Sequence, residues 1–169
     1  MMLDKAVAFL QREIKEEVAR AKREKHTIYI GTAHLNYLYI RALLNQPADE
    51  TTRLLTKLAL KQAPTATMDF KALLAVVLQK TGDKKEAKTL RESLKEHTVS
   101  TPAFGRYFDT QRTRFSSQWY RIPAQVATIE ALRASGNAAD EKVADEMRLW
   151  LMQSKRTQMW QASRTSADA

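Results

Sequence analysis

Seven segments of this sequence have helical spacing of their apolar residues, and they fall into two alternating kinds. Residues 3–23 show the first kind, in which apolar side chains recur at steps of three and four with charged residues between them. Residues 66–80 show the second kind, which is apolar on nearly every side and therefore needs neighbours all around it. A chain with this alternation has to place one set of helices inside the other, which predicts an all-α fold.

The boundaries of these segments follow from local signals. The amphipathic helices are expected near residues 3–23, 49–62, 83–97 and 140–155, and the apolar helices near residues 32–45, 66–80 and 123–134. Thr32 is expected to cap the second helix, and Gly82 is expected to end the fourth. With only 4 Gly and 4 Pro, the chain has little room for the turns of a β-rich fold. Residues 98–122 are predicted to form a long loop that enters the next helix at Pro123.

The turn at residues 81–87 resembles the turn at residues 135–141, and weak self-similarity of helix pairs is typical of a stacked or ringed helical array. A closed ring explains best why one set of helices has no polar, solvent-exposed face. We therefore predict that residues 1–169 form a single helical domain, a partial α/α toroid of alternating inner and outer helices. Residues 164–169 have the pattern of a helix start, so the chain is expected to be a fragment of a larger toroid. Apolar surface left open by that truncation predicts self-association.

Several classes of function have no support in the composition. The chain has no cysteine, which excludes a disulfide framework, a thiol nucleophile and a thiolate metal site. No apolar run approaches the length of a membrane span, and the first residues show no secretory signal pattern. The net charge is +9, but lysine and arginine interleave with glutamate along residues 3–23 and 83–96, as on a solvated helix surface.

No catalytic or metal-binding constellation is visible in the sequence. The three histidines (His26, His34 and His97) lack metal-ligand spacing and are interpreted as solvated or helix-end residues. Of the four carboxylates at Asp140, Glu141, Asp145 and Glu146, two lie in a first helical turn, where negative charge is stabilised by the helix dipole, so the group is interpreted as structural. The expected inner helices carry few acids, mainly Asp69 and Glu130. We therefore predict no enzymatic activity, no metal and no cofactor.

Aromatic and arginine residues gather between residues 104 and 125, and these give the candidate interaction surface. Its members are Tyr107, Arg112, Arg114, Trp119, Tyr120, Arg121 and Gln125. In one interpretation, these side chains stack the bases and neutralise the phosphates of a single-stranded nucleic acid. In the other, the aromatics close one end of the helical array and dock against a neighbouring domain. We favour the second, because packing is the commoner fate of large aromatic residues. Trp150 is assigned to the core, and Trp160 to a helix junction.

The sequence resembles the α/α-toroid (complement-like, thioester-type) domain of bacterial alpha-2-macroglobulins. The resemblance is carried by the order and spacing of several stretches and is strongest from residue 66 onward. These stretches are residues 72–75, 81–87, 94–97, 119–120, 122–125, 129–131, 140–147 and 149–152, then Lys155, residues 157–158, Trp160 and residues 165–169. Thioester-forming members of that family carry a Cys-Gly-Glu-Gln motif, which this chain lacks.

The resemblance implies a non-catalytic, structural piece of a protease-trapping inhibitor. The parent protein would be cleaved by a protease, change shape and entrap it. Implied partners are other domains of the parent chain and, through the whole parent, proteases. The implied location is the periplasm, the cell envelope or the exterior. The alternative is a basic helical module that binds nucleic acid or a protein partner, with nucleic acid the less favoured ligand.

Overall fold

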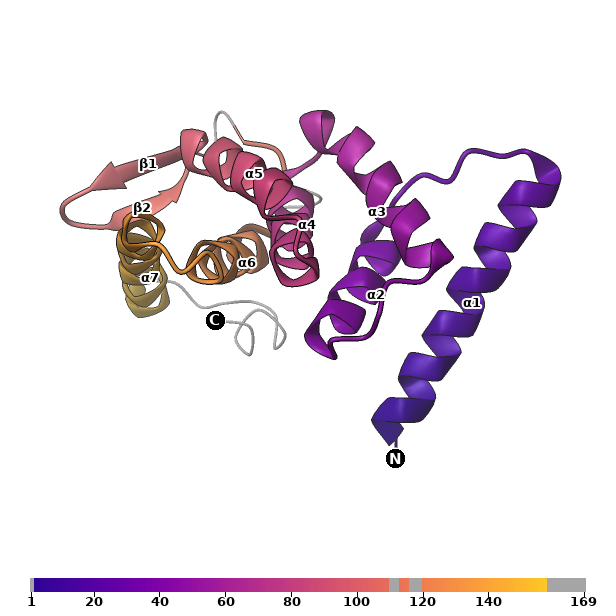
Figure 1. Cartoon of the computed structure of the whole chain (residues 1–169). Coiled ribbons are helices and arrows are strands. Elements are labelled where there is room, and N and C mark those ends of the chain that lie inside the picture. The colour runs from indigo at the N-terminus through magenta and orange to yellow at the C-terminus, as the bar shows by residue number, and fades with distance from the viewer. Residues whose placement is uncertain (1, 110–112, 116–119, 158–169) are drawn as a thin grey trace. The chain divides into compact units, whose positions relative to one another are not determined.

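The computed structural model describes residues 2–109, 113–115 and 120–157 of the 169-residue chain (Figure 1). In that part, seven α-helices and one small hairpin confirm the all-α class. The helices are α1 (Met2–Glu24), α2 (Thr32–Leu43), α3 (Glu50–Gln62), α4 (Met68–Thr81), α5 (Lys84–Glu96), α6 (Arg121–Arg133) and α7 (Ala138–Thr157). Each end of each helix lies within two residues of its predicted position. A 3-10 turn, η1 (Ala63–Thr65), follows α3 at Pro64.

Most of the predicted boundary signals act as expected. Gly82 ends α4 with a left-handed φ of 96°, which glycine adopts without steric strain. Asp49 caps α3, and its carboxylate accepts a hydrogen bond from the Thr52 N–H. The expected cap at Thr32 is wrong by one residue, because α2 has Gly31 as its N-cap. There the His34 ring accepts the Gly31 N–H at 3.2 Å and replaces a hydroxyl cap.

The predicted loop at residues 98–122 contains regular structure that the sequence analysis did not anticipate. Strands β1 (Thr98–Thr101) and β2 (Gly105–Phe108) form an antiparallel hairpin, with Thr98 opposite Phe108 and Thr101 opposite Gly105. β-branched residues in the first strand and aromatic residues in the second favour extended backbone. Phe108, the last residue of the second strand, is 1% exposed and belongs to the core.

The chain forms two compact units, residues 1–64 and 65–169. In the first unit, α2 contacts both α1 and α3. Arg41 of α2 is buried and holds the following loop: it donates to the Pro47 carbonyl at 2.6 Å and to Asp49 Oδ2 at 3.3 Å. Leu43, the last residue of α2, and Leu44 directly after it stay 44% and 46% exposed. The assignment of residues 1–169 to one toroid domain remains a prediction.

In the second unit, α4 and α6 pack against each other, α5 packs on α4, and α7 packs on α6 (Figure 1). Nine of the 14 residues of α4 are buried, but only four of the 13 residues of α5 are, as expected for a central and a peripheral helix. The hairpin contacts α7 and α6 through β2. The core shared by these elements consists of Met68, Ala72, Leu94, Phe108, Ala124, Ile129, Leu132, Ala144, Met147, Trp150 and Leu151.

Candidate functional site: an aromatic–arginine cluster and a buried polar network

The structure brings together three of the seven residues predicted to form an interaction surface. Tyr107 lies on β2, Arg121 is the first residue of α6, and Gln125 lies one turn later. Of the others, Tyr120 is the N-cap of α6, and Arg114 is exposed in the described stretch of residues 113–115. The remaining two, Arg112 and Trp119, lie outside the described residues.

Trp150 of α7 is the centre of this cluster. Its ring stacks with Tyr107, with centroids 5.9 Å apart and an interplanar angle of 25°. The guanidinium carbon of Arg121 lies 4.8 Å from the centre of the same ring, in cation–π contact. Trp150 is 8% exposed, which confirms its assignment to the core. Its spacing from Met147 and Leu151 placed Trp150 on the inward stripe of its helix, but the sequence did not indicate its contacts with Tyr107 and Arg121.

Gln125 is a core residue and cannot belong to an interaction surface, because only 1% of it is exposed. Its Nε2 donates to the Arg106 carbonyl at 2.8 Å and to the Met147 carbonyl at 3.3 Å. The amide therefore joins β2 and α7 to α6. The sequence could not show whether Gln125 is buried or exposed, because a glutamine on an otherwise apolar helix face is compatible with both.

Replacing Gln125 with methionine is expected to lower the free energy of unfolding by about 1–3 kcal/mol. Methionine keeps the length and apolar contacts of the side chain but leaves the Arg106 and Met147 carbonyls without this donor. Urea unfolding followed by circular dichroism measures the change. Lys88→Met, at an exposed position of α5, is the control and should change the free energy by less than about 0.5 kcal/mol. A Gln125→Met protein as stable as the wild type would contradict the bridging role.

Two further aromatics of the loop, Phe108 and Phe115, also point inward. Phe108 is 1% exposed and meets Phe115 edge-on, with ring centroids 5.9 Å apart. The Arg114 carbonyl accepts the Met68 N–H at 2.8 Å, which fixes this part of the loop at the start of α4. Phe108, Phe115 and Tyr107 thus pack in or against the core, whereas Phe104 stays 55% exposed.

A second arginine near the cluster is neutralised. Arg106 Nε lies 2.8 Å from Glu146 Oε2, and Ser100 Oγ donates to the same carboxylate oxygen at 3.1 Å. The Arg106 hydrogen bond, more than any other contact, holds the pKa of Glu146 below its ordinary value, against the opposing effect of burial. Glu146, which the sequence analysis treated only as a helix residue, is therefore the ion-pair partner of the hairpin.

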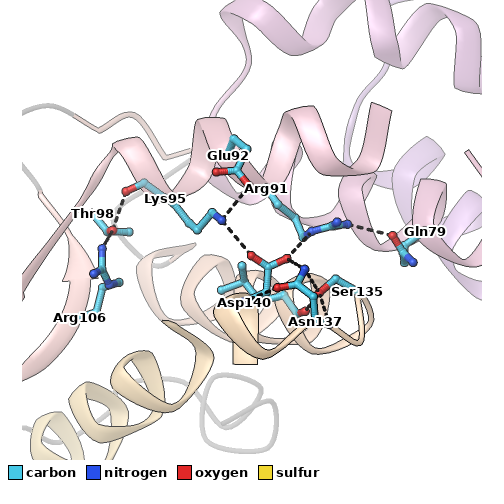
Figure 2. A network of polar contacts seen from close by, with 10 residues as sticks. Gln79, Arg91, Glu92, Lys95, Thr98, Arg106, Ser135, Asn137 and Asp140 are labelled. Carbon is cyan, nitrogen blue, oxygen red and sulfur yellow. Dashed lines mark hydrogen bonds and ion pairs between the residues drawn. The ribbon is translucent and has the colours of Figure 1, made fainter. Parts of the chain in front are cut away.

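The strongest polar constellation of the second unit was missed by the sequence analysis. Asp140, at the start of α7, is 2% exposed. Figure 2 shows the side chains of Arg91, Lys95 and Asn137 around its carboxylate. Its Oδ2 accepts from Arg91 Nε at 3.0 Å, and its Oδ1 accepts from Lys95 Nζ at 2.8 Å. Asn137 Nδ2 also donates to Asp140 Oδ2 at 2.8 Å. Arg91 Nη1 donates a further hydrogen bond to Gln79 Oε1 of α4 at 2.9 Å. The network joins α4, α5 and the α6–α7 turn. The sequence indicated only that Asp140 lies in a first helical turn.

The charges of this network determine the pH range over which it stabilises the fold. Burial raises the pKa of Asp140, but hydrogen bonds from Lys95, Ser135 and Asn137 and the charge of Lys95 outweigh it and hold this pKa below its ordinary value. Burial lowers the pKa of Lys95, but hydrogen bonds to Asp140 and Glu92 outweigh it and raise this pKa. A carboxylate with a depressed pKa stabilises the fold above its unfolded-state pKa, and a lysine with a raised pKa stabilises it below its own.

The stability difference between wild type and Asp140→Asn should therefore be constant from about pH 5 to about pH 9. It should shrink below about pH 4, because protonation of Asp140 removes the same charge that the substitution removes. Urea unfolding at pH values from 2 to 9 measures this difference. Asp145→Asn, at an exposed position of the same helix, is the control for general charge effects. A difference that persists unchanged at pH 2 would contradict the ion-pair assignment.

The three histidines lie at separate positions in the described part of the chain. His97 is the C-cap of α5, and His26 is exposed. His34 lies at the start of α2 but is 7% exposed, with Nε2 3.2 Å from Glu17. Within residues 2–109, 113–115 and 120–157, no group of three histidine or acidic side chains has the arrangement of a metal site.

An open groove lies between α6 and α7 in the second unit. Its wall combines apolar side chains with charges of both signs, and Glu141 is already paired with Arg133 at 3.1 Å and Arg148 at 3.7 Å. The lining residues are Lys80, Val126, Ile129, Glu130, Arg133, Ala134, Glu141, Arg148, Leu151 and Met152. Of these two pairs, Arg133–Glu141 joins α6 to α7, and Glu141–Arg148 lies within α7.

The described helices include none with the length and hydropathy that a membrane crossing requires. Comparison with known proteins gives no match to a family model, to a curated protein or to a solved structure. The function therefore has to be argued from the residues and their geometry.

Proposed function

We propose that this chain is a non-catalytic helical scaffold, part of the α/α toroid of an alpha-2-macroglobulin-like protease trap. The family assignment rests on the sequence resemblance alone. The structural support concerns the scaffold role: the buried polar side chains of the second unit are used to join helices to one another. The observation that carries this role is the Asp140 network, in which one carboxylate holds two cations from a neighbouring helix pair.

The arrangement of helix pairs gives further support to a repeating array. The α4–α5 pair and the α6–α7 pair are each joined by a short turn with a left-handed glycine, Gly82 at φ 96° and Gly136 at φ 70°. These are the two turns whose sequences resemble each other. In each pair the first helix is central and the second is peripheral, which is the order that a toroid of inner and outer helices requires.

In this proposal, the chain itself needs no cofactor, metal or thioester. Its partners are other domains of the parent protein, and proteases are met only through the parent. The parent would act in the periplasm, at the cell envelope or outside the cell. Copies of the isolated chain would associate through apolar positions such as Leu43 and Leu44.

A substrate-size assay tests the trap. The natural gene product that contains this sequence is incubated with a broad-specificity endopeptidase, and cleavage of a small chromogenic peptide and of casein is followed. A trap closes only after it has been cut, and it then excludes large substrates by size. We expect limited cleavage of the protein, retained activity on the peptide and at least a tenfold loss of activity on casein. The same protease with its active site blocked beforehand is the control and should neither cut the protein nor be retained with it.

Equal loss of activity on both substrates would indicate an active-site inhibitor and would contradict the trap. Absence of cleavage and of inhibition would contradict it as well. The alternative, a basic module for nucleic acid, has no specific observation in its favour, because Arg106 is paired with Glu146 and Tyr107 is packed against Trp150.

A further inference from the structure

Arg121 carries a charge that no described residue neutralises. The residue is partly exposed, but its Nε atom is buried and has no hydrogen-bond partner. Burial lowers the pKa of the Arg121 guanidinium, and the nearby Tyr107 phenol opposes that effect more weakly. Among residues 2–109, 113–115 and 120–157, no carboxylate forms an ion pair with it. A desolvated charge without a counter-charge is unfavourable, and native proteins generally pair such groups.

The guanidinium is also held in a defined orientation. It lies 4.8 Å from the centre of the Trp150 ring, and Trp150 is itself fixed by its stack with Tyr107. A guanidinium presents its N–H donors in a fixed planar fork that matches the geometry of a carboxylate. Holding the side chain in place before binding reduces the entropy lost when a ligand binds.

The neighbouring charges indicate which anion the position suits. Arg106 is neutralised by Glu146 at 2.8 Å, so it adds no free positive charge to the cluster. One uncompensated guanidinium matches one carboxylate. Recognition of a nucleic-acid backbone would instead require several free cations along a track.

We propose that the Arg121–Trp150–Tyr107 cluster is a binding site for a single carboxylate, presented by an acidic side chain of a protein partner or by a free carboxylic acid. The guanidinium donates to the carboxylate, and the buried Trp150 ring holds the guanidinium in place. The proposal does not depend on the trap function, and it names a carboxylate as the class of ligand.

Titration of the full chain with small probes tests the site. The probes are acetate, the blocked tripeptide acetyl-Gly-Glu-Gly-amide and its uncharged match acetyl-Gly-Gln-Gly-amide, all at constant ionic strength. The readouts are the NMR resonances of the Arg121 Nε–H and the Trp150 indole N–H, which are assigned from Arg121→Gln and Trp150→Phe proteins. We expect saturable shifts of both resonances with the glutamate peptide and none with the glutamine peptide.

The variants separate binding from folding. Arg121→Gln should weaken binding of the glutamate peptide at least tenfold, and Arg121→Lys should weaken it several-fold, because lysine lacks the planar fork. Arg114→Gln, at an exposed arginine of the same loop, should leave the affinity unchanged. Circular dichroism spectra matching the wild type confirm that each variant is folded. If a variant fails to fold, comparing the glutamate and glutamine peptides on the wild-type protein still decides whether the site binds a carboxylate.

The relative affinities identify the source of the carboxylate. Tighter binding of the glutamate peptide than of acetate supports a protein side chain as the ligand, and equal binding supports a free carboxylic acid. Equal or tighter binding of inorganic phosphate would overturn the carboxylate assignment. Shifts that follow total salt, that do not saturate or that persist in Arg121→Gln would overturn the site itself.

Discussion

Replacing Asp140 with alanine will destabilise the second unit by about 3–5 kcal/mol. Asp140 is 2% exposed and binds Arg91 at 3.0 Å and Lys95 at 2.8 Å. Removing the carboxylate leaves the Arg91 guanidinium, only 5% exposed, in a region of low dielectric without its counter-charge. Urea unfolding at pH 7, followed by circular dichroism, measures the change.

Two further variants test whether the effect comes from the unpaired charge. Asp145→Ala removes an exposed carboxylate that pairs with Arg148 on the same helix, and it should change stability by less than about 1 kcal/mol. The double variant Asp140→Leu, Arg91→Met should recover much of the stability lost in Asp140→Ala, because it removes both buried charges. An Asp140→Ala protein within 1 kcal/mol of the wild type would show that the network does not hold the helix pairs together.

Replacing Gly105 with alanine should destabilise the same unit by about 2–5 kcal/mol. A Cβ atom at this position would lie 2.3 Å from the Glu146 carbonyl oxygen and 3.1 Å from Leu149 Cβ. The first of these atoms belongs to the backbone of α7 and cannot move away as a side chain can. In addition, Gly105 has a φ of 73°, which an L-residue adopts only with strain. Thermal unfolding gives the size of the effect.

Gly136→Ala separates the two causes. Gly136 has nearly the same backbone conformation, with a φ of 70°, but its added Cβ would meet nothing within 4 Å. The expected loss is about 1–2 kcal/mol, from backbone strain alone. Equal losses in Gly105→Ala and Gly136→Ala would mean that the close approach of β2 to α7 is not important for stability.

The sequence was sufficient to locate the helices. Helical periodicity, prolines and left-handed glycines are local signals, and they placed every helix end within two residues. The same signals distinguished α4, which is buried on most sides, from the half-exposed α5. Periodicity could not find the hairpin, because two four-residue strands within a polar loop give no repeating pattern. The clearest single signal for it was Gly105, the one glycine between two β-favouring stretches.

The sequence predicted only part of the candidate site. Composition directed attention to residues 104–125, and Tyr107 and Arg121 do meet there. Their meeting point, Trp150, lies on another helix, and Gln125 turned out to be buried. Which side chains share a cluster depends on contacts between residues far apart in the chain, and no single-sequence pattern encodes those contacts.

By itself, then, the sequence determined the all-α class, the positions of the helices and the absence of cysteine chemistry, because these depend on local backbone preferences and on composition. Only the tertiary structure decided that Asp140 binds Arg91 and Lys95 and that Arg121 lies on Trp150 without a carboxylate partner among the described residues. The physical reason is burial: a charged side chain has the same sequence signal whether it faces water or the interior. Its partner and the strength of the interaction are fixed only when packing removes the solvent around it.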